Sequence, residues 1–518
     1  MSFRVLAHDL CPYNPNLVQL DWQAPLTSTK FTRKGPKVRS RRVRHVRASK
    51  EDERAGRPRP SSLAQQAFPL ASIQEYTFIR RDSDYEPLVA EIWNDQIHRG
   101  WPRAIPYTTP EGVNVAVRQC VKFISTDDSA YYILLCGGII GYTSWRHDRV
   151  SIKTLPQLFH KTRISAVRAL RKDIASLGHR MPSDALLASI LSFALQETVY
   201  HNDAVECPPW PKSPLARAQL LNWAGGLHHH SHHLDAFFGL LQRRGGFETV
   251  TDPGLRRLVH ICDLLTSSLT ATAPRFPRPD SGQSPVSINQ LDLDAGALQL
   301  SSTFGARFKQ FSPLSWQFLE PLVDLLPDLR QVTVAIDMHH RSLGQAPPLG
   351  KLADLANYVH WSILSLRDAS EPAIRTDATD ATEVGMRAIA RQTLEPVRLA
   401  ILVFSNLLIF PVSISAGVAA YLASSLRDLY EHNQVRIFEP EFEAWILAMG
   451  YIASWGTNDR LWFLVRLKRM IDSLSRSRGE EPSLEAWLDI MRGFLWWEHV
   501  CVVPLSEAWA DMYNKTST

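Results

Sequence analysis

The segment 228–233, which reads His-His-His-Ser-His-His, is the densest group of metal-ligand side chains in the sequence. His228 with His232, and His229 with His233, have the i, i+4 spacing that lets two imidazoles share one metal ion on a helix face. No Asp, Glu or Cys lies inside the segment, so a third ligand would have to come from elsewhere. The pattern indicates adventitious or structural metal binding, or simply the polar first turn of a helix. We expect the helix turn, and we predict no metal and no cofactor.

A run of cations forms the second chemically distinctive group. Residues 30–59 carry 13 Lys or Arg against 3 acidic residues, whereas the rest of the chain carries 44 against 49. At its centre lie Arg39, Arg41, Arg42, Arg44 and Arg47. Such a segment can displace counterions from DNA with little sequence choice, and it also has the composition of a nuclear import signal. We expect these arginines to serve import, with weak nucleic-acid contact as the second role.

Patterns typical of enzymes are absent from the sequence. No Gly-x-Ser-x-Gly motif nominates a nucleophile, and the glycine pairs at 137–138 and 245–246 are not followed by the Lys-Ser/Thr of a phosphate loop. No two of the 6 cysteines lie closer than 16 positions, which excludes a local zinc spacing and argues against a disulfide framework. We therefore predict reduced thiols and no catalytic activity.

The elements that would position these groups centre on residues 183–269, which predict three amphipathic helices. The first follows Ser183, a residue type that caps helix N-termini. The second ends at Arg243-Arg244-Gly245-Gly246, where cations meet the negative end of the helix dipole and glycine can adopt a left-handed conformation. The third begins at Asp252-Pro253, a cap followed by proline in the first turn. These three helices form a scaffold.

Helical periodicity extends well beyond this centre. We predict an all-α fold, a large helical array over residues 83–512, preceded by a disordered basic N-terminal arm over residues 1–72. Further helices are expected at 113–124, where strand-like alternation competes with a 3.6-residue repeat, at 131–142, and at 159–175, a basic helix that carries Arg163, Arg168, Arg171 and Lys172. Later helical blocks are expected near 313–343, 350–368, 383–430, 438–475 and 483–512.

The uncharged run from Leu399 to Leu426 is long enough to cross a bilayer. It contains Asn406 and five serines, and Phe410-Pro411 divides it into two segments of the length of core helices. We expect a buried helix pair and no membrane contact.

The residues around 183–277 resemble the fungal-specific transcription factor domain, the helical regulatory region usually found after a binuclear zinc cluster. The matching residues are His233, Leu234, Leu241, Arg244, Gly245, Gly246, Asp263, Pro274, Phe276 and Pro277. A weaker similarity continues through 398–402 and from Trp445 to Trp455. The cysteine-rich module that reads DNA in that family is missing here, so the resemblance implies regulation without zinc-dependent, sequence-specific DNA binding.

Together these features predict a nuclear regulatory protein of the fungal transcription-factor type, which acts through its helical domain on a partner protein or a small effector. The alternative is a non-catalytic cytoplasmic scaffold. A C-terminal surface rich in tryptophan is a candidate for core or homodimer contacts. Its members are Trp445, Trp455, Trp487, Trp496 and Trp497.

Overall fold

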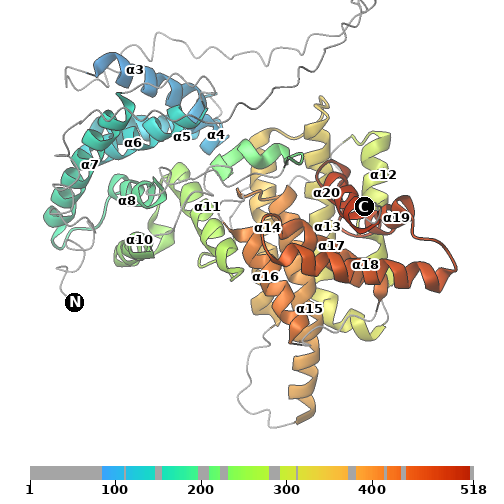
Figure 1. Cartoon of the computed structure of the whole chain (residues 1–518). Coiled ribbons are helices and arrows are strands. Elements are labelled where there is room, and N and C mark those ends of the chain that lie inside the picture. The colour runs from blue at the N-terminus through green and yellow to red at the C-terminus, as the bar shows by residue number, and fades with distance from the viewer. Residues whose placement is uncertain are drawn as a thin grey trace, which may run out of the picture. The chain divides into compact units, whose positions relative to one another are not determined.

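The structure is a computed structural model, and it describes residues 85–109, 112–145, 154–196, 209–221, 231–278, 292–310, 313–370, 381–413, 417–432 and 439–513. The chain divides into two units, Met1–Arg80 and Arg81–Thr518, and all described residues belong to the second. Within these residues the fold is all-α and contains no β-strand, as predicted (Figure 1). The predicted basic arm lies outside them.

The bounds of the helices are, in chain order, α3 Glu86–Asp95, a π-helical turn η1 Gln96–Gly100, α4 Trp101–Ala104, α5 Val115–Thr126, α6 Asp128–Trp145, α7 Leu155–Leu177, α8 Asp184–Gln196, η3 Pro214–Leu220, α10 Ser231–Arg244, η4 Phe247–Thr249, α11 Pro253–Thr270, α12 Ala295–Thr303, η6 Ala306–Gln310, α13 Pro313–His340, α14 Leu349–Ser370, α15 Ala381–Leu408, α16 Val418–Glu431, α17 Pro440–Ala453, α18 Asp459–Arg478, α19 Leu484–Arg492 and α20 Glu498–Tyr513.

One hydrophobic core lies among α5 to α8, α10 and α11. Its central element is α6, which packs against α3, α5, α7 and α8. Helices α6 and α3 approach closely at Gly138, where a Cβ atom would lie 2.9 Å from Ile92 Cγ2 of α3. The strand-like alternation at 113–124 is helical in α5, and Asn114 caps that helix by accepting a hydrogen bond from Val117 N at 3.1 Å.

A larger core is built from η3, α11 and the helices from α13 to α20. Helix α11 contributes to both cores, because Leu255, Val259 and Cys262 face the first while Ile261 and Leu264 face the second. Its predicted cap is confirmed, since Asp252 Oδ1 accepts from Gly254 N at 2.9 Å and from Leu255 N at 3.0 Å.

Two predicted helical blocks are each divided into two helices. Block 438–475 breaks between α17 and α18, where Gly456 adopts a φ of +71°. Block 483–512 breaks between α19 and α20, because the chain there pairs with another segment: Gly493 O and Phe494 O accept from Arg307 N and Gly305 N. Periodicity alone carries no information about such a distant backbone pairing.

The tryptophans predicted to form a C-terminal surface are mostly interior. Trp445, Trp487, Trp496 and Trp497 are buried in the larger core, and only Trp455 is partly exposed. The surface interpretation is therefore wrong for these four residues, and the core alternative holds. Each of these rings buries a large apolar area in the core between the C-terminal helices.

The apolar run at 399–426 forms two helices, as predicted, but only the first is buried on all sides. The residues from Leu399 to Phe404 in α15 are buried, whereas α16 buries one side and exposes Tyr421 at 44%. None of the described helices combines the length and the hydropathy needed to cross a membrane.

Candidate functional site

The five arginines predicted to contact nucleic acid or an import receptor, from Arg39 to Arg47, lie outside the described residues. The same holds for His228, His229 and His230. Helix α10 begins at Ser231, and His233 in its first turn is buried, with its ring 5.5 Å from that of Phe193 in an edge-to-face contact. The described residues contain no group of three potential metal ligands.

The residues that carry the family resemblance meet at one junction. Arg244, at the end of α10, forms an ion pair with Asp184 at the start of α8 and donates to Thr249 O at 3.0 Å. Gly245 and Gly246 follow with φ values of +110° and +90°, which glycine adopts without a Cβ clash. The turn they form lets the chain reverse from α10 into η4.

A second part of this junction is a buried carboxylate. Asp263 of α11 accepts hydrogen bonds from Arg275 N at 3.2 Å and Phe276 N at 2.9 Å, which fixes the segment that follows the helix. Burial raises the pKa of Asp263, and these hydrogen bonds oppose the rise. Phe276 then stacks on Phe247 with ring centroids 5.0 Å apart. The motif therefore holds α8, α10 and α11 together and presents no reactive group.

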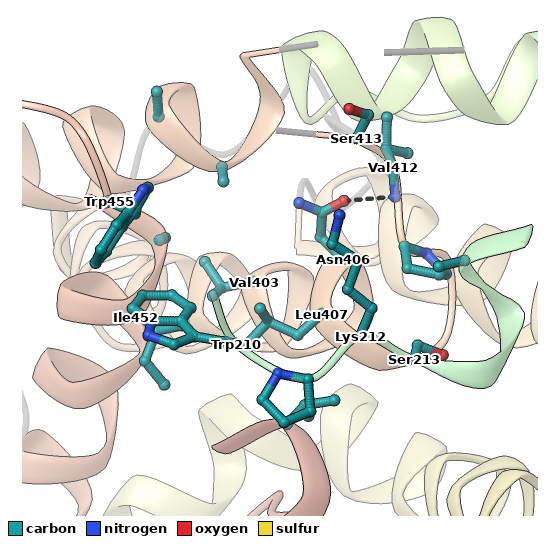
Figure 2. Close-up of a pocket in the computed structure, with 17 residues that line it drawn as sticks. Trp210, Lys212, Ser213, Val403, Asn406, Leu407, Val412, Ser413, Ile452 and Trp455 are labelled. Carbon is teal, nitrogen blue, oxygen red and sulfur yellow. Dashed lines mark hydrogen bonds between the residues drawn. The ribbon is translucent and has the colours of Figure 1, made fainter. Parts of the chain in front are cut away.

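An apolar cavity of about 220 Å³ is the strongest candidate for a binding site (Figure 2). Its walls come from the segment before η3, the end of α15, the start of α16, the end of α17 and the start of α20. The lining residues are Trp210, Pro211, Lys212, Ser213, Ala216, Val403, Asn406, Leu407, Pro411, Val412, Ser413, Ala419, Ala420, Ile452, Ala453, Trp455 and Val500.

The proline break in the apolar run creates this cavity. Because Pro411 cannot continue α15, the chain turns away and leaves a space before α16 begins. The turn is fixed by Asn406, whose Oδ1 accepts from Val412 N at 3.1 Å, the bond drawn in Figure 2. Ser213 closes the opposite side by donating to Leu408 O at 2.6 Å.

One wall of the cavity is a pair of tryptophans held from behind by polar groups. Trp210 and Trp455 meet edge to face with ring centroids 4.7 Å apart, and Trp210 Nε1 donates to Glu507 at 2.9 Å. The guanidinium of Arg460 lies 4.4 Å from the Trp455 ring centroid and donates to Tyr451 Oη at 2.6 Å. These contacts fix the aromatic wall, so that a ligand meets a preformed surface.

The chemistry of the lining favours binding over catalysis. Lys212, which is exposed, is the one charged residue in it, and Ser213, Asn406 and Ser413 supply neutral polar groups. No His, Cys, Asp or Glu belongs to this lining, so it contains no acid–base pair. A dry cavity of ~150 Å³ holds benzene, so the volume of about 220 Å³ is sufficient for an aromatic ring, and Lys212 is the one cation in the lining that can pair with an anion.

Three ionisable side chains outside this cavity are buried in the protein interior. His360 lies between Ser268 and Ser405, with ring nitrogens 2.7 Å and 2.8 Å from their hydroxyl oxygens, and it stacks on Phe410. Burial lowers the pKa of His360 to about 3, so the imidazole is neutral. Burial likewise raises the pKa of Cys136 and Cys501 to about 12, which keeps both thiols protonated.

Sequence reasoning did not identify the cavity. The proline at 411 was the available signal, but the lining residues lie on segments up to 290 positions apart, from Trp210 to Val500. The polar groups that brace the wall, Arg460 and Glu507, have no local pattern. No family model, curated protein or solved structure matches the chain.

Proposed function

We propose that this chain is a nuclear regulatory protein, similar to the fungal-specific transcription factor domain proteins but without their zinc cluster. In this proposal the helical body binds a small effector or a partner protein, and the arginines from Arg39 to Arg47 supply import and weak nucleic-acid affinity. The protein performs no chemistry on what it binds. It responds to an effector by a shift between conformations of the helices around the binding site.

The observation that carries the proposal is the cavity between Trp210, Trp455 and the end of α15. It has a preformed aromatic wall, one cation and no acid–base pair. Its walls come from the successive helices α15, α16 and α17 and from two distant segments, at Trp210 before η3 and at Val500 of α20. A ligand there would contact all of them at once, so its binding energy can favour one arrangement of these helices over another.

The junction around Arg244 adds support for the family resemblance. Arg244 joins α10 to α8 through Asp184, and Asp263 of α11 holds Phe276, which stacks on Phe247 just after the glycine turn. The closeness of these contacts supports the proposed relationship to that family.

The nuclear part is tested in living cells with the full chain fused to a fluorescent protein. Removal of residues 30–60 is expected to abolish nuclear accumulation. A variant in which the five arginines from Arg39 to Arg47 become glutamine should behave in the same way. The matched control replaces five other cations of the arm, Arg33, Lys34, Lys37, Arg54 and Arg57, by glutamine, and should remain nuclear. Nuclear accumulation of the truncated chain would contradict the proposal and favour a cytoplasmic scaffold.

The effector part is tested by calorimetry with aromatic carboxylates of one and two rings, such as benzoate and 2-naphthoate. Ala420→Leu fills the cavity, so 2-naphthoate is expected to bind at least about tenfold more weakly. Lys212→Met should weaken the binding of 2-naphthoate but not that of naphthalene methanol, which has no carboxylate. Ala175→Leu, at an exposed position of α7 outside the lining, is the control. Equal affinities for Ala420→Leu and the unaltered chain would contradict the assignment of the cavity.

A further inference from the structure

Helix α7 carries an outward face that is rich in cations. The helix contains five Lys or Arg and a single acidic residue, Asp173. Its apolar side, which includes Leu158, Ala166 and Leu170, is buried against α6. The cations that remain outside are therefore held in place by a helix that is itself fixed to the core.

The outward cations lie on one side of this helix. Lys161, Arg168, Arg171 and Lys172 are spaced so that all four fall within about one third of the helix circumference at 100° per residue. All four are exposed. From Lys161 to Lys172 the face extends about 16 Å along the axis, at ~1.5 Å per residue.

Intramolecular contacts do not account for three of these charges. Arg168, Arg171 and Lys172 form no ion pair with a carboxylate of the described residues, and none of them stacks on a described aromatic ring. The acidic residue of the helix turns away from them, since Asp173 Oδ2 is buried. Lys172 lowers the pKa of Asp173 through space, but burial outweighs this and raises it.

The geometry points to this face of α7 as a contact surface for the phosphate backbone of a nucleic-acid duplex. A DNA duplex carries about one negative charge per 1.7 Å of its axis, so 16 Å of helix faces more phosphates than it has cations. The face has one exposed apolar residue, Ile164, at 40% exposure. Its cations can pair with phosphates whatever the base sequence, so the contact proposed here is to the backbone.

A membrane surface is the less suitable partner for the same helix. A helix that lies on a bilayer inserts its apolar side among the lipids. In α7 that side is occupied by the protein core, and Ile164 alone cannot replace it. Phosphates of a rigid duplex require only exposed cations at fixed positions, which the helix offers.

The surface goes beyond the function proposed above, which places nucleic-acid affinity in the arm. It is tested with the full chain by fluorescence anisotropy, using a DNA duplex of about 25 base pairs, an RNA duplex of the same sequence and phosphatidylserine vesicles over a range of salt. In the variant Arg168→Gln, Arg171→Gln, Lys172→Gln, the slope of log affinity against log salt should fall by about 2 to 3, since each phosphate contact contributes about 0.9. Affinity at ~0.1 M salt should fall at least about tenfold.

The matched control removes the same charge elsewhere, with Lys351→Gln, Arg469→Gln and Arg476→Gln at exposed positions of α14 and α18. This control variant should keep the slope of log affinity against log salt of the unaltered chain. The variant Arg168→Lys, Arg171→Lys retains the charge and should bind as the unaltered chain does. The two duplex arms show whether DNA, RNA or both supply the phosphates. Three results would overturn the proposal: equal losses of duplex affinity in the two glutamine variants, an unchanged salt slope in the α7 variant, or a loss of affinity for vesicles alone. None of these results depends on where the protein accumulates in cells.

Discussion

Helices α7 and α18 have similar lengths and similar charge, yet they use their cations differently. Helix α18 contains six Lys or Arg against two Asp, compared with five against one in α7. In α18, Arg460 lies over Trp455, Arg466 lies 4.4 Å from the Trp462 ring centroid, and Lys468 lies 3.7 Å from that of Tyr513. In α7, Arg168, Arg171 and Lys172 have no such partner among the described residues.

These two helices show that a basic helix is not in itself a binding surface. Four cations of α18 stabilise the fold, because Arg460, Arg466 and Lys468 cover aromatic rings and Arg478 pairs with Glu441. Removal of such a cation affects the protein itself.

In α7, Lys161 lies over the ring of Tyr85 and Arg163 over that of Phe193. The other three cations of α7 have no carboxylate partner among the described residues and repel one another along the helix. Removal of cations from α18 should therefore lower the free energy of unfolding, whereas removal of cations from α7 should change the salt dependence of nucleic-acid binding.

The largest effect is expected from Arg460→Ala in α18. The guanidinium lies over Trp455 and Tyr451, hydrogen-bonds to Tyr451 Oη and reaches Glu507 at 3.6 Å. Its loss removes a cation–π contact and leaves partly buried partners without their donor, so the free energy of unfolding should fall by about 2 kcal/mol. Urea unfolding followed by circular dichroism measures this change.

The control for this substitution lies on the same helix. Arg469 of α18 is exposed, and Arg469→Ala should change the free energy of unfolding by less than about 0.5 kcal/mol. Since the aromatic wall of the cavity depends on Arg460, the Arg460→Ala protein should also bind 2-naphthoate more weakly. Equal stabilities of the two variants would show that α18 does not use its cations for folding.

A smaller effect on the free energy of unfolding, which depends on pH, is expected from His360. The Ser268 hydroxyl donates to Leu264 O at 2.6 Å, so Nε2 of His360 donates to Ser268 Oγ and Nδ1 accepts from Ser405. The pKa of His360 is about 3 in the folded protein and 6.5 when the chain is unfolded. Below pH 6.5 the unfolded chain binds a proton that the folded one does not, so stability falls as pH decreases from 6.5 towards 3.

The variant His360→Gln isolates this contribution. Both proteins share every other titrating group, so the difference between them reports His360. From pH 7 to pH 5.5 the unaltered chain should lose about 1 kcal/mol more than the variant, as expected from ~1.4 kcal/mol per pH unit below 6.5. Parallel pH profiles in urea unfolding experiments would mean that the imidazole is not held neutral.

The sequence predicted the helical elements because their signals are local. The caps at Ser183 and Asp252, the left-handed glycines after Arg244 and the proline at 411 each act within a few residues of where they stand. The break before α20 was missed because Gly493 O pairs with Arg307 N, nearly two hundred positions away. The prediction of a tryptophan surface was wrong for a related reason, since the burial of a side chain depends on which helices pack together.

The candidate sites show the same limit. The pattern at 159–175 predicted a basic helix, but only the packing of α7 on α6 shows which cations face outwards. Sequence alone could not distinguish α7 from α18, because the rings that cover Arg466 and Lys468 come partly from other helices. The cavity was beyond prediction because it is the space between five such segments.

The smallest effect on stability is expected from the variant with Arg168, Arg171 and Lys172 replaced by glutamine. Glutamine has nearly the helix propensity of these residues, and their exposed side chains form no ion pair or ring contact with the described residues. Arg168 and Lys172 are four residues apart, so removal of their repulsion should stabilise the helix by about 0.2–0.5 kcal/mol at low salt. This gain should vanish in about 1 M salt, where charges are screened within ~3 Å. A loss of more than about 1 kcal/mol in thermal or urea unfolding would show that α7, like α18, uses its cations for folding, and the difference between the two helices would no longer hold.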